Sequence, residues 1–86
     1  PLKGETTTIT DYAVYPNPAN DAINIAGTSD LEKAELLDVT GKIVKTAISN
    51  KIDIVTINIS DLTNGVYILK CYSDNGEIIS KKIVKQ

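Results

Sequence analysis

β-branched residues are abundant in this chain, and they limit the folds open to it more than any other feature. Thirteen Ile, six Val and nine Thr make up 28 of its 86 residues, whereas Phe, Trp and Met do not occur. β-branched side chains are restricted at χ1 and pack well on the pleated surface of a sheet. The composition therefore predicts an all-β protein, and a chain of this length forms one domain.

Short stretches of alternating apolar residues, separated by turn residues, predict about seven strands. These strands follow one another about every ten residues, and no stretch has a helical period. The predicted strands are residues 12–15, 22–26, 32–39, 42–48, 52–59, 66–73 and 77–85. This spacing favours a seven-stranded, antiparallel β-sandwich of the immunoglobulin-like type. Residues 1–10 have no clear period and are interpreted as a linker, which leaves residues 11–86 as the domain.

Proline and glycine mark where the predicted strands end. The Tyr-Pro-Asn-Pro segment at residues 15–18 is a rigid kink, because proline fixes φ and favours extended geometry in the residue before it. Such a kink can carry the chain from one sheet to another. Thr40-Gly41, Asn64-Gly65 and residues 74–76 (Asp-Asn-Gly) predict tight reversals. Asp61 could cap a single helical turn.

The alternation of apolar residues changes phase in the stretch 52–59. Ile52 and Ile54 share one face of an ideal strand, whereas Val55, Ile57 and Ile59 share the other. One face of a regular strand cannot bury both sets. A bulge near Ile54, or a strand that begins at Val55, would reconcile the two phases.

Two other predicted strands are apolar on both faces. In the stretch 32–39, Ala34 and Leu36 share one face, while Leu37 and Val39 share the other. The stretch 66–73 has the same character. The first of these is interpreted as a central strand of a sandwich.

The residues needed for nucleophilic or metal-dependent catalysis are largely missing. The chain has no His, so it has no Ser–His or Cys–His pair and no cluster of zinc ligands. Cys71 alternates with Leu69 and Tyr67 and is interpreted as a small buried hydrophobe. Ser80 and Lys82 are interpreted as solvated surface. We therefore predict that the chain is not an enzyme and needs no cofactor.

Charge and aromatic content argue against nucleic acid and membrane as partners. The net charge is −2, all nine cations are Lys, and four Tyr are the only aromatic residues. A nucleic-acid site would favour Arg, a basic stripe and a stacking platform. No stretch approaches the roughly 20 apolar residues of a membrane helix, and no membrane insertion is expected. The acidic residues near predicted loops do not have the spacing of a calcium loop; they are Asp53, Asp61, Asp74 and Glu77.

Six segments, taken in order, resemble a known family. They are Val14–Pro18, Ile23 with Ile25, Leu36–Val44, Ile57–Leu62, Asn64–Leu69 and Lys81–Lys85. Over residues 12–86 the chain resembles the C-terminal sorting domain of the type IX (Por) secretion system of Bacteroidetes-type bacteria. The chain has neither an initiator Met nor a visible signal peptide, so we expect it to be the C-terminal end of a longer protein.

The resemblance implies an immunoglobulin-like sandwich that acts as an address for an attached cargo domain. The outer-membrane export machinery would recognise it in the periplasm, and a surface sortase would commonly remove it within residues 1–10. The cargo would then reach the cell surface or the extracellular space. By motif, the residues of the sorting signal are Gly65, Tyr67, Lys81, Lys82 and Lys85.

Each of these five residues also has a purely structural interpretation. Gly65 suits a backbone with positive φ, Tyr67 suits a core with its hydroxyl at the rim, and the lysines discourage edge-to-edge pairing of sheets. We also expect that the edge of the last strand can pair with a partner by strand addition.

Two other functions remain open from the sequence. An accessory sandwich that binds carbohydrate or protein would display exposed aromatic residues, ideally a coplanar row of the four Tyr. An inert spacer would be followed by further sequence in its parent protein.

Overall fold

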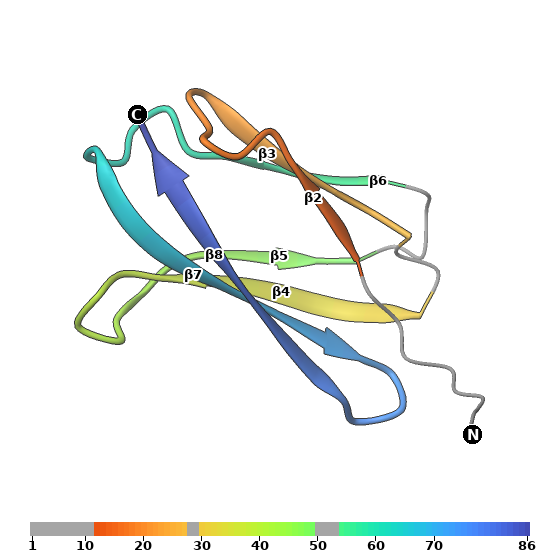
Figure 1. The fold of residues 1–86 in the computed structure, drawn as a ribbon. Helices are drawn as coiled ribbons and strands as arrows, with labels where there is room; N and C mark the ends of the chain where they lie inside the picture. The colour runs from red at the N-terminus through yellow and green to blue at the C-terminus, as the bar shows by residue number, and fades with distance from the viewer. Residues whose placement is uncertain (1–11, 28–29, 50–53) are drawn as a thin grey trace, which may run out of the picture.

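The computed structural model describes residues 12–27, 30–49 and 54–86, and in these residues the chain forms seven strands and no helix (Figure 1). No described segment is therefore a helix that could cross a membrane. The predicted linker, residues 1–10, lies outside the described residues. The strands are β2 (Ala13–Tyr15), β3 (Ala22–Ala26), β4 (Leu31–Leu37), β5 (Ile43–Ile48), β6 (Ile54–Asn58), β7 (Gly65–Ser73) and β8 (Ile78–Lys85).

The strands form two antiparallel sheets that pack face to face. One sheet has the order β2-β3-β6 and the other has the order β5-β4-β7-β8. In the letters used for immunoglobulin domains, these orders are A-B-E and C′-C-F-G. The all-β, immunoglobulin-like sandwich predicted from the sequence is therefore confirmed.

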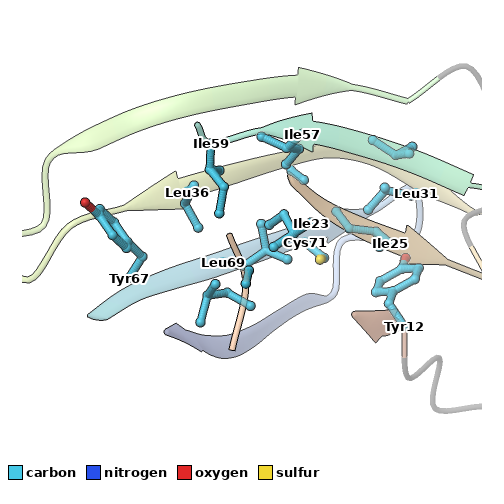
Figure 2. Close-up of a cluster of buried hydrophobic side chains, with 14 residues drawn as sticks. Tyr12, Ile23, Ile25, Leu31, Leu36, Ile57, Ile59, Tyr67, Leu69 and Cys71 are labelled. Carbon is cyan, nitrogen blue, oxygen red and sulfur yellow. The ribbon is translucent and has the colours of Figure 1, made fainter. Parts of the chain in front are cut away.

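The core lies between the two sheets and is built from the inward residues of each strand (Figure 2). Ile23 and Ile25 of β3 are fully buried, as are Leu36 of β4 and Leu69 of β7. This is the alternation that a pleated strand imposes. Burial of each such aliphatic side chain contributes about 1.5–3 kcal/mol, so the Ile-rich composition supplies the core without Phe, Trp or Met.

The structure resolves the change of phase in residues 54–59. Strand β6 begins at Ile54, which is exposed, and the following residues alternate so that Val55, Ile57 and Ile59 are buried. β6 pairs with β3 in unbroken register from Ile54 to Asn58. The prediction of a strand that begins near Val55 is therefore closer than the prediction of a bulge; Ile52 lies outside the described residues.

The prediction that Val39 belongs to a strand is wrong. β4 ends at Leu37, and Val39 is exposed in the turn that follows. One carboxylate oxygen of Asp38 accepts hydrogen bonds from the Thr40 amide (2.9 Å) and hydroxyl (2.5 Å) and from the Lys42 amide (3.1 Å). This side-chain cap replaces the ladder of the sheet and ends the strand.

The kink at residues 15–18 ends β2 and brings Ala19 to the edge of the second sheet, before the chain returns to the first sheet as β3. The Tyr15–Pro16 and Asn17–Pro18 peptide bonds are both cis. After the kink, the Ala19 amide donates to the Val84 carbonyl and the Gln86 amide donates to the Ala19 carbonyl, each at 2.8 Å. The segment that begins beside β3 therefore continues as a short parallel neighbour of β8.

Candidate recognition site

Several connections between strands lie at one end of the sandwich, and they contain most of the segments that resemble the sorting-domain family. The connections 16–21, 38–42 and 59–64 meet there with the last residues of β8 (Figure 1); we call this the loop end. The chain enters at Tyr12 at the opposite end, where the Tyr12 hydroxyl donates to Asp30 (3.2 Å). The loop end is thus separated from the entry point by the length of the sandwich.

A shallow groove of about 270 Å³ lies at the loop end, between the β4–β5 turn and the β6–β7 connection. Its wall on one side is the Asp38 turn, in which hydrogen bonds from Thr40 and then Lys42 keep the pKa of Asp38 below its ordinary value. Its other wall is the connection that leads into β7. The residues that line the groove are Asp38, Val39, Thr40, Thr63, Asn64, Gly65, Val66 and Tyr67.

Tyr67 holds the groove's second wall in place from within the core. Its side chain is buried and its hydroxyl donates to the Thr63 carbonyl oxygen at 2.6 Å. A tyrosine near the start of strand F that bonds back to the preceding connection is the tyrosine corner of immunoglobulin-like domains. Tyr67 is the second residue after Gly65, the first residue of β7, where φ is +153°. Both residues therefore have a structural role at this site.

The three predicted lysines do not form one patch. Lys81 and Lys82 are consecutive in β8, so they point to opposite faces of the sheet. Lys82 is exposed on the outer face and pairs in register with Ile68, whereas Lys81 is half-buried on the inner side. Lys85 is buried opposite Gly65, and its ammonium donates to the Gln86 carbonyl oxygen (3.3 Å). Of the three lysines, only Lys82 is thus exposed.

Asn17 is a residue of the site that the sequence did not single out. Its side-chain amide donates to the Lys82 carbonyl oxygen (2.8 Å), and its oxygen accepts from the Val84 amide (3.0 Å). The amide thereby imitates a neighbouring strand on the edge of β8. Asn17 and Ala19 together occupy the backbone hydrogen-bonding groups on this edge of β8 between Lys82 and Gln86. A partner strand therefore cannot pair with this part of β8, where the sequence led us to expect strand addition.

The β6–β7 connection contains no helical turn among its described residues. Leu62 donates to the Ile59 carbonyl oxygen (3.0 Å) in a simple turn. The sequence suggested that Asp61 could cap a single helical turn, but Asp61 does not cap a helix. It forms an ion pair with Lys45 of β5 (2.8 Å), and the hydrogen bond from Lys45 lowers the pKa of Asp61. This pair ties the loop end to the four-stranded sheet.

Other polar groups of the described residues do not form a reactive site. The described part of the chain has no group of three or more acidic or cysteine side chains placed to hold a metal ion. Burial raises the pKa of Cys71 to about 11, so its thiol is protonated at neutral pH. Tyr12 and Tyr67 are buried, Tyr72 is half-buried and only Tyr15 is exposed. The four Tyr therefore do not form the exposed row that would favour carbohydrate binding.

Comparison with known proteins decides the family. Residues 13–86 match the family described as the secretion system C-terminal sorting domain. This chain belongs to that family. The type IX sorting domain identified from its sequence motifs is thereby confirmed, as is its role as a secretion signal.

Two further similarities bear on this sorting domain. It is 38% identical over 73 residues to Beta-agarase D of Zobellia galactanivorans; the match covers 83% of the sorting domain and 14% of the agarase. The chain thus spans about one seventh of the length of that relative. In structure it is similar to CopC from Methylosinus trichosporium OB3b, with 17% identity, a TM-score of 0.50, and coverage of 87% of this chain and 91% of CopC. The second similarity concerns the fold alone.

Proposed function

We propose that the export machinery of the type IX system reads this sorting domain at its loop end and then carries the attached cargo across the outer membrane. The observation that carries this proposal is that five of the six resembling segments reach the loop end. They are separated by up to 70 residues in the sequence, and the fold brings them together.

The geometry suggests two kinds of role for the five predicted signal residues. Gly65, Tyr67 and Lys85 shape the loop end from buried or backbone positions. Lys82 is exposed and is the residue that we expect to contact the machinery directly. Lys81, on the opposite face of β8, contributes from the inner side.

The cargo is expected to precede the sorting domain in the same polypeptide. Tyr12 and Tyr67 lie at opposite ends of the core (Figure 2), so a cargo attached on the side of Tyr12 would leave the loop end accessible. The 14% share of Beta-agarase D that the match covers supports attachment to a much larger protein. Removal by a surface sortase would fall in residues 1–10, and the cargo would then be bound to the cell surface or released.

The test is export of a reporter fused in front of this chain, in a bacterium that possesses the type IX route. We expect the reporter outside the cell in the parent strain and in the periplasm when the outer-membrane channel is deleted. A reporter that stays in the periplasm of the parent strain would contradict the proposal. In a strain without the sortase, exported reporter should retain the sorting domain; loss of the domain there would contradict the proposed cleavage.

Point variants test the signal residues better than truncation does. Deletion of residues 77–86 removes β8 and the partners of Asn17 and Ala19, so it would unfold the domain and not only remove a signal. We expect Lys82→Ala to reduce export about fivefold to tenfold, which is the range for loss of one important interface side chain. Lys33→Ala, at the other end of the same face, is the matched control. Equal export of the two variants would contradict a direct role for Lys82.

A further inference from the structure

The outer face of the four-stranded sheet has an aliphatic cluster that the core does not use. Leu37 of β4 lies between Ile43 of β5 and Ile68 of β7, and Val66 lies opposite Val84 of β8. These five residues, which we call the outer patch, alternate with the buried residues of the same strands. Ile43 is 48% exposed and Val66 is 39% exposed, while the other three are half-buried.

The outer face of the other sheet is different in character. There, Asn24 accepts a hydrogen bond from the Thr56 hydroxyl (2.8 Å) and donates one to the Tyr15 carbonyl oxygen (3.3 Å), between the small residues Ala22 and Ala26. Tyr15 and Ile54 are also exposed on that face (43% and 42%), but they lie on the two edge strands with β3 and Asn24 between them, so they do not form one aliphatic cluster. Contiguous exposed apolar surface on a soluble domain is typical of an interaction site.

The outer patch is continuous with the loop end. Val66 belongs to the outer patch and also lines the groove beside Gly65. Val39, which is exposed in the β4–β5 turn, lines the same groove. A partner that contacts the groove would therefore extend onto the outer patch without crossing a polar boundary.

Positive charge dominates the rim of the outer patch. Lys82 lies in register with Ile68, and Lys42 directly precedes Ile43; both are exposed. Two carboxylates lie nearby, those of Glu35 and of the β4–β5 turn, and the latter offsets part of the positive charge of Lys42. Glu35 accepts from the Tyr72 hydroxyl (2.8 Å) and pairs with Lys33 (3.5 Å), and the carboxylate of the β4–β5 turn accepts the hydrogen bonds that form that turn.

We propose that the outer patch docks a protein surface of the export machinery, with aliphatic side chains at its centre and carboxylates that face Lys82 and Lys42. This inference rests on the proposed function and adds the surface and the chemistry of the partner. Complementary charge around an apolar centre gives orientation and rapid association. Adjacent strands of a sheet are rotated by about 20–25° relative to one another, so the partner surface follows this twist.

The geometry disfavours two other occupants. A second copy of this chain, placed on the same patch by a two-fold axis, would bring the cationic rims of Lys82 and Lys42 into apposition, and like charges at an interface are unfavourable. Membrane binding inserts apolar groups about 5–10 Å into the interface. Three of the five residues of the outer patch are half-buried in their own sheet, so most of the patch does not project that far.

The experiment compares two double variants of the reporter fusion. Ile43→Thr with Val66→Thr makes the outer patch polar and keeps β-branched side chains, so the sheet is retained. Ile48→Thr with Ile78→Thr is the matched control on the same face, outside the patch, at residues that are 68% and 57% exposed. We expect at least a tenfold loss of export for the first pair, as for loss of an interface centre, and export within twofold of the parent for the control. Thermal unfolding must show both pairs folded.

Carboxylates on the partner are tested by carbodiimide coupling, which joins a Lys amine to a carboxylate. During export we expect a coupled product that is lost when Lys82 and Lys42 are both replaced by Ala and kept in Lys33→Ala. Sedimentation of the purified chain and flotation with vesicles of phosphatidylethanolamine and phosphatidylglycerol test the other two occupants.

The outcomes separate this inference from the proposed function. Failure of the unmodified fusion to be exported would refute the proposed function, and the docking surface with it. Export of the unmodified fusion with equal loss, or no loss, in the two double variants would refute only the outer patch. A coupled product that survives the combined replacement of Lys82 and Lys42 by Ala, dimerisation abolished by the patch variant, or vesicle binding abolished by it would also overturn the inference.

Discussion

Asn17 provides the sharpest test of how the two sheets are joined. Its side chain makes two hydrogen bonds to the main chain of β8, at Lys82 and Val84, across 65 and 67 residues of sequence. Asn17→Ala removes both. Asn17→Asp keeps the oxygen that accepts from Val84 and replaces the donor to Lys82 by a second oxygen.

The expected magnitude follows from the number and exposure of these bonds. A neutral hydrogen bond contributes about 0.5–1.5 kcal/mol net, and water can replace the lost partners because Asn17 is exposed. We therefore expect Asn17→Ala to lower the free energy of unfolding by about 1–2 kcal/mol. For a domain of this size, each kcal/mol corresponds to about 4–8 °C in Tm. Asn17→Asp should be at least as destabilising, because its new oxygen faces the Lys82 carbonyl.

The assay combines thermal unfolding with hydrogen exchange at the Val84 amide. That amide should exchange rapidly in Asn17→Ala and remain protected in Asn17→Asp, although both variants have a lower Tm. Asn20→Ala, in the same connection and also exposed, is the control and should leave both readouts unchanged. A Tm for Asn17→Ala equal to that of the control, with Val84 still protected, would refute the role assigned to Asn17.

Three further predictions concern single side chains. Tyr67→Phe loses the hydrogen bond to the Thr63 carbonyl (2.6 Å) and should cost about 1 kcal/mol in chemical denaturation; a loss too small to measure would contradict the tyrosine corner. Burial raises the pKa of Cys71 to about 11, so at pH 8 about one thiol in a thousand is ionised, against about a quarter in an unfolded chain. Iodoacetamide should therefore label the folded protein at least about 100-fold more slowly than the urea-unfolded protein, and comparable rates would show that the thiol is accessible. The lowered pKa of Asp61 beside Lys45 adds stability that is present above about pH 4 and is lost as the pH falls through the lowered pKa. The Tm advantage of the parent over Asp61→Asn should therefore shrink between pH 7 and pH 3, and a constant difference would argue against the ion pair.

Much of the fold could be predicted from the sequence because local rules agree along the chain. The alternation of Ile23 with Ile25, and the Asp-Asn-Gly reversal at residues 74–76, each match the observed element. The kink at residues 15–18 was also predicted to end a strand, because two prolines remove donors that a continuing strand would need. These features depend only on neighbouring residues.

The parts that the sequence did not predict depend on contacts between distant residues. Val39 follows the apolar alternation of the predicted strand. The chain turns there instead, because the carboxylate of Asp38 accepts hydrogen bonds from the Thr40 and Lys42 amides. Asn17 has no local pattern that indicates its bonds to β8, apart from its position between two prolines. The sequence shows that both faces of residues 66–73 are apolar, but it does not show which of these residues the other sheet covers. β7 is central in its sheet, yet its outer face includes Val66, which is partly exposed.

The hydrogen bonds between residues 17–19 and residues 82–86 have one more consequence, because a ribosome synthesises the chain from its N-terminus. When Asn17 and Ala19 emerge, their hydrogen-bond partners have not yet been made. Pairings between such distant residues form late and slowly. A long loop must be closed first, and the hydrogen bonds offset the entropy lost in that closure only after it has occurred. A product whose synthesis stops before residue 82 therefore lacks a finished sandwich. The export machinery can recognise the folded domain only after its last strand has been synthesised and paired. A folded domain therefore indicates that the polypeptide before it has been translated.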